Sequence, residues 1–404
     1  MMASHRAVSR LARLDQHRRL SALSLQPTPP FVLERFFAAH EFSCKHALCS
    51  SDTEAVSLAD TVARMSGDTR ALWESLSLGY TETRGHPRML ELLAEDYDGL
   101  APANFQELAP QEAILLTFAA LIEPGDAVVA TAPGYQSFFT CAEAAGGVVA
   151  EWRPRFDGGA ARFDVADLER LCAAHRPTCV AVNFPHNPTG ALPSEEEWAR
   201  VVDVCDAHGA YLFADEIYRG LGRTLPAAAA AYGRGISLGG LSKSLGMPGV
   251  RAGWLAAKDD AFLTRVAELR DYTTICSSAP SQILAIAALE DKAALLRRSN
   301  AFVDAGRAAV SGVLDAHADK LGWGPGPAAG PVGWIRLERG SAAAYVDALL
   351  ESDDGLLLLP STVFDAGDAH VRAGFGRADS PALMAKWRAT LDDADHPATA
   401  LLRA

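Results

Sequence analysis

One segment of the sequence sets a lysine among small and apolar residues, directly after a predicted strand. It runs from Leu241 to Trp254 and contains Lys243, three glycines and, eight positions after the lysine, Arg251. Apolar surroundings lower the pKa of an amine, and a neutral amine can form a Schiff base with an aldehyde. A nearby arginine can bind a phosphate through two hydrogen bonds. The segment therefore predicts a partly buried, nucleophilic Lys243 beside an anion site, the alternative being an ordinary surface lysine.

Two further segments carry polar groups at the ends of predicted strands. Residues 183–190 contain Asn187 in an Asn-Pro-Thr-Gly turn, and residues 214–218 contain Asp215 and Tyr218. In a doubly wound sheet, ligands bind outside the carboxyl ends of the strands, so these groups can converge with Lys243. Taken singly, the first segment can be a plain turn and Asp215 a helix N-cap. Three such segments in this order favour one shared site.

Short apolar runs alternate with amphipathic stretches between about residues 85 and 270, which predicts a mainly parallel sheet covered on both faces. The expected strands are Ala127 to Ala132, Gly147 to Trp152, Cys179 to Phe184, Tyr211 to Ala214, Gly235 to Leu238 and Ala252 to Ala256, and the clearest helices are Asp164 to His175 and Glu195 to His208. The sheet supplies the strand ends that the polar segments need.

The C-terminal part has a different pattern, which predicts a smaller α+β lobe. A Gly/Pro-rich break from Gly322 to Gly333 precedes expected strands at Trp334 to Leu337, Leu356 to Leu359 and His370 to Phe375, with a helix from Ala342 to Leu350. We expect residues 1–74 to form an N-terminal segment and part of the small domain, 75–285 the large domain, and 286–404 the small C-terminal domain.

Bulk properties exclude several classes of function. The formal net charge of −13 argues against nucleic acid as a partner. The sequence contains no run of about 20 apolar residues, the length that would span a membrane. Seven scattered cysteines indicate reduced thiols in a cytoplasmic protein. The histidines, including His86 and His186, lack the spacing of a metal site, so no metal is predicted.

The first stretch, Met1 to Leu25, is rich in arginine and poor in acidic residues. This composition is compatible with an organelle transit peptide. We favour a helix that packs across a subunit boundary or is partly frayed.

With the three polar segments in place, the chain resembles the class I/II aminotransferases of the fold-type I pyridoxal-phosphate superfamily, from about residue 45 to 390. The resemblance implies an α/β large domain, a smaller domain and pyridoxal 5′-phosphate as cofactor. Lys243 matches the lysine that forms the internal aldimine and later moves the substrate proton. Asp215 matches the partner of the pyridinium nitrogen.

The same resemblance assigns other residues by position. Asn187 and Tyr218 match donors to the cofactor phenolate, and Tyr135 matches the aromatic residue that stacks on the ring. The phosphate would be held by Arg251, by the helix start at Gln111, by Ser242 and by Tyr80 of a neighbouring subunit, which implies a homodimer. Arg372 matches the arginine that clamps the substrate carboxylate. Ser51 and Asn187 are expected on the substrate side.

Three departures separate this chain from the common pattern. Pro110 supplies no backbone N–H to the phosphate, and Gly240 stands where many relatives have a serine. Ser242 or Ser237 is a candidate to compensate. The usual glycine-bearing substrate loop is replaced by the segment from Leu48 to Glu54.

The predicted reaction is transfer of the amino group of an amino acid to a 2-oxo acid. The segment from Asp271 to Pro280 and the loop from Cys49 to Asp52 are also similar to a subgroup related to capreomycidine synthase, whose members eliminate a β-hydroxyl group and close a ring. A lyase or cyclase acting on a specialised, basic amino acid is the alternative. A non-enzymatic relative is disfavoured because Lys243 and Asp215 are both intact.

The substrate side chain is predicted only from charge. No second arginine is identified for a distal carboxylate, so a dicarboxylate substrate is not expected. Glu41, Asp52 and Glu54 lie near the segment that should border the pocket and could meet a guanidinium or amine. The alternative is that they are solvated or capping carboxylates.

Overall fold

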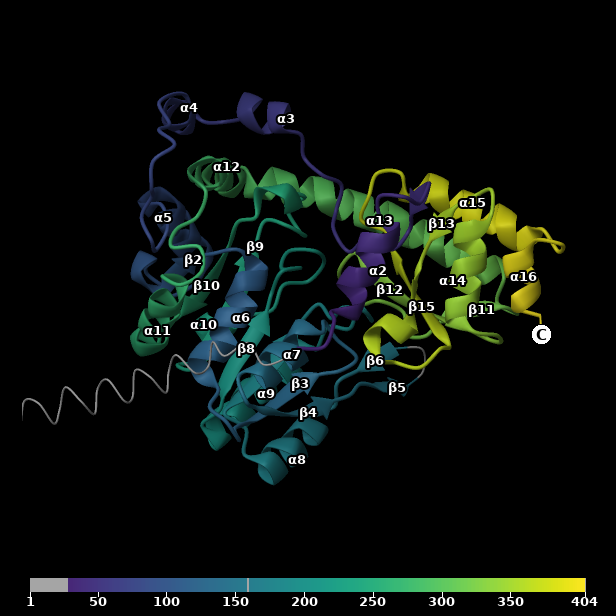
Figure 1. The fold of residues 1–404 in the computed structure, drawn as a ribbon, viewed down its shortest axis with the longest axis horizontal. Helices are drawn as coiled ribbons and strands as arrows, with labels where there is room; N and C mark the ends of the chain where they lie inside the picture. The colour runs from purple at the N-terminus through teal and green to yellow at the C-terminus, as the bar shows by residue number, and fades with distance from the viewer. Residues whose placement is uncertain (1–27, 158–159, 404) are drawn as a thin grey trace, which may run out of the picture.

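The computed structural model describes residues 28–157 and 160–403, so the helix predicted for Met1 to Leu25 lies outside the described residues. The chain forms a large lobe around a seven-stranded sheet and a smaller lobe that includes the C-terminus (Figure 1). This confirms the predicted α/β fold class. The domain boundaries at residues 75 and 286 stay a prediction.

The central sheet is mixed but mostly parallel, with the order β2-β10-β9-β8-β7-β3-β4. Five neighbouring strands are parallel, and β10 runs antiparallel to both β9 and β2. The strands are β2 (Phe105–Glu107), β3 (Ala127–Thr131), β4 (Val148–Trp152), β7 (Cys179–Asn183), β8 (Tyr211–Asp215), β9 (Gly235–Gly240) and β10 (Gly253–Ala257). All six strands predicted from apolar runs are present, and β2 was missed because it is short.

Helices cover both faces of this sheet because its strands are apolar on both faces. In β3, Val128 packs into the layer under α6, α7 and α11, while Val129 packs against α8 and α9 on the other face. The helices of the large lobe are α5 (Pro87–Asp96), α6 (Pro110–Leu121), α7 (Ser137–Ala144), α8 (Val165–His175), α9 (Glu195–His208), α10 (Ala228–Ala231), α11 (Asp260–Arg270) and α12 (Ala279–Glu290), with short 3-10 turns η2 (Pro102–Asn104) and η3 (Pro248–Val250).

The small lobe is built on an antiparallel sheet of order β11-β12-β15-β14. Its strands are β11 (Leu321–Trp323), β12 (Val332–Leu337), β14 (Leu359–Pro360) and β15 (His370–Gly374), and its helices are α14 (Ala342–Glu351), α15 (Ser380–Asp392) and α16 (Pro397–Leu401), with the turn η4 (Ser361–Phe364). The predicted break at Gly322 therefore begins inside a strand. The predicted run from Leu356 to Leu359 is divided into β13 (Leu356–Leu357) and β14.

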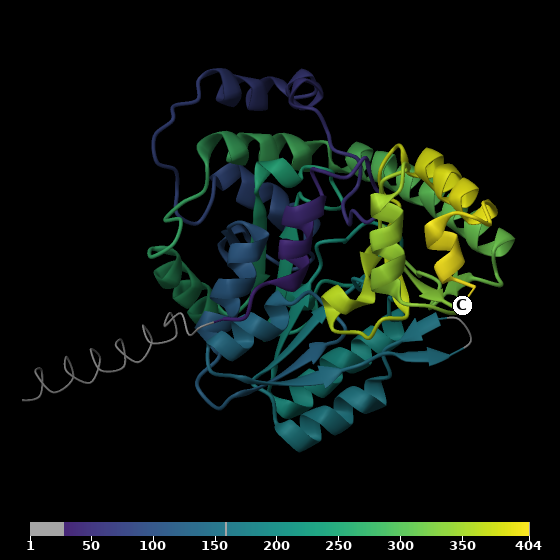
Figure 2. The same ribbon diagram turned by 45° about the vertical axis from the view of Figure 1, so that its right-hand side comes forward.

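One long helix joins the lobes. The 25 residues of α13 (Lys292–Ala316) start against the large lobe, where Leu295 is buried, and end in the core of the small lobe around Val310 (Figures 1 and 2). Within residues 28–157 and 160–403, neither this helix nor any other is long and apolar enough to cross a membrane.

The N-terminal part of the described chain touches both lobes. β1 (His46–Ala47) pairs in parallel with β13 of the small lobe, while α3 (Leu58–Ala63) and α4 (Gly67–Glu74) lie against α12. Helix α2 (Val32–His40) lies between the lobes in both views (Figures 1 and 2). The remaining β5 (Arg155–Asp157) and β6 (Ala160–Arg162) form a small hairpin.

The order of the strands fixes where a ligand can bind. The chain passes from β3 to its neighbour β4 on one side of β3, and the later strands β7, β8 and β9 lie on the other side of β3. The carboxyl ends of β3 and β7 therefore border a topological switch point, the usual ligand-binding crevice of such sheets. Tyr135 follows β3, Asn187 follows β7, Asp215 ends β8, and Lys243 follows β9.

A single glycine controls how closely the small lobe approaches the loop at residues 48–52. The Gly374 N–H donates to the Leu48 carbonyl at 2.7 Å, and a Cβ at Gly374 would lie 1.9 Å from the Ser50 carbonyl oxygen. We expect Gly374→Ala to destabilise the fold by about 2–3 kcal/mol, because the neighbouring atom is backbone and must shift. Urea unfolding measures this loss.

Gly312 in α13 provides the matched control, because a Cβ there meets nothing within 4 Å. Gly312→Ala should stabilise the helix by up to about 1 kcal/mol. Equal effects of the two alanines would contradict the close packing inferred at Gly374.

Candidate functional site

A pocket of about 420 Å³ lies at the carboxyl ends of the strands, and the predicted polar segments meet there. Nine of the predicted site residues line it: Ser51, Gln111, Tyr135, Asp215, Tyr218, Ser242, Lys243, Arg251 and Arg372. Asn187 contacts the pocket through Arg372. Tyr80 lies outside it.

Lys243 presents its amine to this pocket. Its Nζ donates to the Ser51 hydroxyl at 3.1 Å. Burial lowers the pKa of the Lys243 amine, and the negative charge of Asp52 partly opposes that shift. The segment around Lys243 therefore produces the partly buried amine that the sequence predicted.

Asp215 is buried at the end of β8, where its Oδ1 accepts the Ile217 N–H at 2.9 Å. Burial raises the pKa of Asp215 to about 7; the backbone hydrogen bond and the positive charge of Lys243 act in the opposite direction. A cationic group placed against this carboxylate would hold it ionised.

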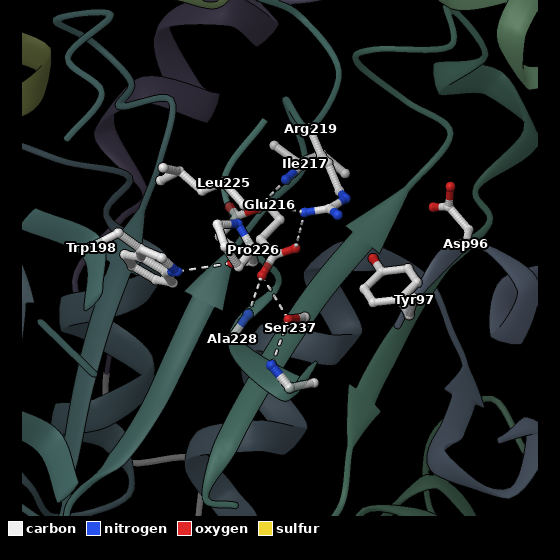
Figure 3. Close-up of polar contacts among 12 residues, drawn as sticks. Asp96, Tyr97, Trp198, Glu216, Ile217, Arg219, Leu225, Pro226, Ala228 and Ser237 are labelled. Atoms are coloured by element: carbon white, nitrogen blue, oxygen red, sulfur yellow. Dashed lines mark hydrogen bonds and ion pairs between the residues drawn. The ribbon is translucent and has the colours of Figure 1, made fainter. Parts of the chain in front are cut away.

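The neighbouring carboxylate, Glu216, takes part in a different network (Figure 3). It accepts hydrogen bonds from the Ser237 hydroxyl at 2.6 Å and the Ala228 N–H at 2.9 Å, with Arg219 at 3.5 Å. The suggestion that Ser237 compensates at the phosphate is therefore wrong, because its hydroxyl is buried and already bonded to Glu216.

Two tyrosines line the pocket. Tyr218 is buried, and burial raises its pKa to about 12. Tyr135 donates its hydroxyl to Glu34 Oε1 at 3.0 Å, and its ring packs on Phe31 with centroids 5.0 Å apart. The Tyr135 phenol is thus held by a hydrogen bond to a residue of α2, outside the central sheet.

Arg372 enters from β15 of the small lobe and is fully buried. Its Nη1 donates to Asn187 Oδ1 at 2.8 Å and its Nη2 to the Cys49 carbonyl at 2.6 Å, while its buried Nε has no partner among the described residues. Since the Asn187 oxygen accepts from Arg372, the amide N–H₂ group of Asn187 is the part left to donate elsewhere.

The two departures at the predicted phosphate end explain each other. Pro110 starts α6, and its ring packs over Gly240, where a Cβ would lie 3.0 Å from Pro110 Cγ and 2.8 Å from Ile217 Cδ1. A serine at position 240 would therefore require both Ile217 and Pro110 to shift. Ser242 instead lines the pocket with a buried hydroxyl oxygen that has no partner in the described chain.

Two more predicted residues border this end. Gln111 follows Pro110 in the first turn of α6, and its Nε2 donates to the Ser137 hydroxyl at 2.5 Å. Arg251 is exposed, with a left-handed backbone at φ 58° that turns its side chain toward the pocket mouth, and its Nη1 lies 3.2 Å from the Pro248 carbonyl. Donor groups without buried ion-pair partners are what an anion requires.

The part of the pocket lined by the α2 segment is acidic. Glu34, Phe37 and Glu41 of the α2 segment line the pocket at a spacing of three and four residues, which places them on one helical face. Burial raises the pKa of Glu41. Glu34 was missed, although this spacing was the signal that could have found it together with Glu41.

The loop acids differ from each other. Asp52 lines the pocket and is paired with Arg377, whose Nε and Nη2 lie 3.1 and 3.2 Å from its two carboxylate oxygens. Glu54 does not line the pocket, because its carboxylate caps the Ala378 N–H at 3.0 Å. The expectation that no second arginine would stand at the substrate side is wrong, since Arg377 lines this pocket too.

Two features lie apart from the site. Tyr80 is 91% exposed and borders a surface groove together with residues 276–280. Among residues 28–157 and 160–403, no three of the His, Cys, Asp and Glu side chains are grouped to hold a metal ion, and the seven cysteines are free thiols.

Comparisons with known proteins agree with this geometry. The family model for aminotransferase class I and II matches residues 66–384. Capreomycidine synthase of Streptomyces vinaceus is 32% identical over 274 residues, which cover 65% of this chain and 67% of that protein. The aspartate/prephenate aminotransferase of Thermus thermophilus is 27% identical over 326 residues, covering 74% and 79% of the two chains.

Solved structures show the same fold. A PLP-dependent aminotransferase from Streptococcus suis superposes with a TM-score of 0.84 at 24% identity, covering 91% of this chain and 98% of that one. The PLP-dependent cyclase OrfR gives a TM-score of 0.81 at 27% identity, with 91% and 99% covered. The resemblance and the cofactor predicted from the sequence are both confirmed. The chain belongs to the class I and II aminotransferase family and is a pyridoxal-phosphate-dependent enzyme of the fold-type I superfamily.

Proposed function

We propose that this enzyme is an aminotransferase that moves the amino group of an amino acid to a 2-oxo acid. The observation that carries the proposal is the meeting of the Lys243 amine, the Asp215 carboxylate and the Arg372 guanidinium in one pocket. An amine, an acid and a carboxylate receptor are the three groups that transamination of an amino acid needs from the protein.

The residues fit the cofactor at its ring end. Lys243 would attach its aldehyde, because a lowered pKa increases the share of the neutral, nucleophilic amine. Asp215 would pair with the ring nitrogen, Tyr135 would lie against the ring, and the Asn187 amide and Tyr218 phenol would donate to its phenolate oxygen. When bound, pyridoxal phosphate supplies an electron sink that lowers the barrier to breaking bonds at the substrate Cα.

The phosphate would be held by Ser242, Arg251 and the first turn of α6 at Gln111. The unpartnered buried hydroxyl of Ser242 supports this assignment, since a buried hydroxyl without a partner is costly unless a ligand satisfies it. We also propose a cytoplasmic homodimer in which Tyr80 of one subunit reaches the phosphate of the other. The 91% exposure of Tyr80 is compatible with that role.

The substrate carboxylate would bind Arg372, which still has a free Nε in a buried setting. Ser51 and Asn187 would border the same end. Once the substrate has freed Lys243, the amine can take the proton from the substrate Cα, and the walls formed by α2 and the small lobe exclude water during that transfer.

A lyase or cyclase acting on a basic amino acid is the second candidate. Two observations favour it: the 32% identity with capreomycidine synthase, and Glu34 and Glu41 lining the same pocket as the reactive amine. Glu41 is the better receptor for a cationic side chain, since Glu34 is bonded to Tyr135 and Asp52 to Arg377. A carboxylate left without a hydrogen bond in a partly buried wall gains most from a guanidinium or ammonium partner.

The reaction is tested by mixing the holoenzyme with single amino acids, basic and β-hydroxylated ones included, without any oxo acid. An aminotransferase should release one equivalent of oxo acid per active site, and it should turn over continuously only after an acceptor oxo acid is added. Absorbance of the bound cofactor and mass spectrometry of the products measure this. Lys243→Ala should abolish turnover. Continuous release of ammonia, water or a cyclised product without an acceptor would instead establish the second candidate.

The role of Asp215 is tested by pH. Because its folded pKa of about 7 exceeds the ordinary value of about 3.9, it stabilises the cofactor-free fold at low pH, and this contribution is lost as the pH rises through about 7. Between pH 5 and 8, wild type should lose about 3 kcal/mol more unfolding free energy than Asp215→Asn. Urea unfolding at both values measures the difference.

Saturating pyridoxal phosphate should reduce this pH dependence in wild type, since a cation beside Asp215 favours its ionised form. Identical pH dependence of wild type and Asp215→Asn would refute the assignment.

The acidic wall is tested by Glu41→Gln. If Glu41 receives a cationic side chain, this variant should lower kcat/KM for arginine-like substrates about 10- to 100-fold and leave neutral amino acids unchanged, because a charge-assisted hydrogen bond is lost. Glu54→Gln is the matched control, because that carboxylate lies outside the pocket and its cap to Ala378 survives as an amide oxygen. Equal activity of both variants on basic substrates would contradict the role of Glu41 as the receptor of a cationic side chain.

The pairing of Asp52 with Arg377 gives a complementary test. Asp52→Asn should release Arg377, so that acidic amino acids gain activity relative to basic ones. Steady-state kinetics with aspartate, alanine and arginine show the change, and an unaltered order of preference would count against a selective role for Asp52.

A further inference from the structure

We infer that Ser51 is a positioning residue for proton transfer: its hydroxyl accepts a hydrogen bond from the free Lys243 amine and holds that amine in a single orientation. This inference rests on the proposed function, because it concerns the step in which Lys243 takes the substrate Cα proton. It adds to the expectation that Ser51 simply borders the substrate.

The hydroxyl contacts the amine directly. Lys243 Nζ donates to Ser51 Oγ at 3.1 Å, and both residues line the pocket together with Tyr218. A serine hydroxyl has two acceptor lone pairs and one donor, so Ser51 can accept from the amine and still donate to another group.

Ser51 is not free to leave this position. The next residues fix the loop onto the lysine segment, because both the Thr53 N–H and the Thr53 hydroxyl reach the Lys243 carbonyl, at 3.3 and 2.7 Å. On its other side, Asp52 is held by Arg377, and Gly374 packs against Ser50. The contact between Ser51 and Lys243 is therefore set by the backbone on both sides of the serine.

The contact involves the free amine of Lys243. Lys243 has a free amine in the cofactor-free chain, and again after the substrate has replaced it on the cofactor. A lysine has a long stem with many rotamers, so a hydrogen bond at its tip reduces the orientations available to Nζ. Ser51 should thus affect proton transfer at Cα and leave cofactor attachment unchanged.

The Ser51 hydroxyl lies in a segment where this chain differs from its relatives. This segment, from Leu48 to Glu54, replaces the usual glycine-bearing loop. A glycine offers no side-chain group to an amine, so relatives with that loop must orient their lysine by other contacts.

The test uses holoenzyme with Ser51→Ala, Ser51→Thr as the conservative replacement, and Ser43→Ala as the control. Ser43 is an exposed serine at the end of α2 whose hydroxyl donates to the Ala39 carbonyl, outside the pocket. Exchange of the substrate Cα proton in D₂O, followed by NMR, should fall at least 10-fold in Ser51→Ala. It should recover to within about 3-fold in Ser51→Thr and not change in Ser43→Ala.

A second readout needs no turnover. In the full-length chain freed of cofactor, labelling of the Lys243 amine by acetic anhydride across pH, read by mass spectrometry, reports its pKa. Loss of the Ser51 acceptor should move the labelling midpoint of Ser51→Ala to lower pH, because a hydrogen bond to the charged form is removed. Affinity for pyridoxal phosphate should stay within about 3-fold of wild type.

The inference would be overturned if Ser51→Ala exchanged the substrate Cα proton and labelled its Lys243 amine as wild type does. A parallel loss of affinity for pyridoxal phosphate would also overturn it, because that loss would indicate a displaced loop. Should wild type exchange no Cα proton with any amino acid, the proposed function fails, and the labelling midpoint alone then decides whether Ser51 holds the amine.

Discussion

The removal of water from Lys243 and Asp215 is the physical constraint on which the rest of the site depends. Burial makes the ionised form of each group costly: it lowers the pKa of the amine and raises that of the carboxyl. Neither shift is possible on an exposed loop. The large lobe supplies the strand ends that carry these groups, and the small lobe with α2 supplies the walls that keep water away.

The same constraint explains why the buried arginines at the pocket have partners. Arg377 is matched with Asp52, and Arg372 is surrounded by the Asn187 amide, the Cys49 carbonyl and the face of Phe364. Each buried cation therefore has acceptors that offset part of its lost hydration. Three pocket-lining atoms are buried without a partner among the described residues, Ser50 Oγ, Ser242 Oγ and Arg372 Nε, and a bound ligand can provide the missing partners.

Much of the site could be predicted from the sequence because its main residues follow strands. Lys243, Asp215 and Asn187 sit at strand ends, and a strand end fixes both the place and the direction of the next few residues. The runs that predicted the strands are continuously apolar, which indicates burial on both faces of the sheet. Val128 and Val129, neighbours in β3, are buried on opposite faces. The family motif then supplied the cofactor, which the comparisons confirm.

The rest could not be predicted because it depends on contacts between distant segments. Glu34 reaches the pocket only because α2 packs between the lobes, and Arg377 turns inward only because Asp52 meets it there. Ser237 was a candidate to replace the missing phosphate-binding serine, yet its hydroxyl is bonded to Glu216. Likewise, the sequence shows Pro110 and Gly240 as separate departures, whereas in three dimensions one makes room for the other.

Helix α13 has a mechanical consequence for the active site. Its 25 residues give it a length of about 37 Å at 1.5 Å per residue. Only Asp291 separates its start from the end of α12, and its far end lies in the core of the lobe that carries Arg372. A rod of this length acts as a lever: a tilt of about 5° at Asp291 displaces its tip by roughly 3 Å. Small adjustments at that one junction are thus enlarged into a change in the distance between the two walls of the pocket.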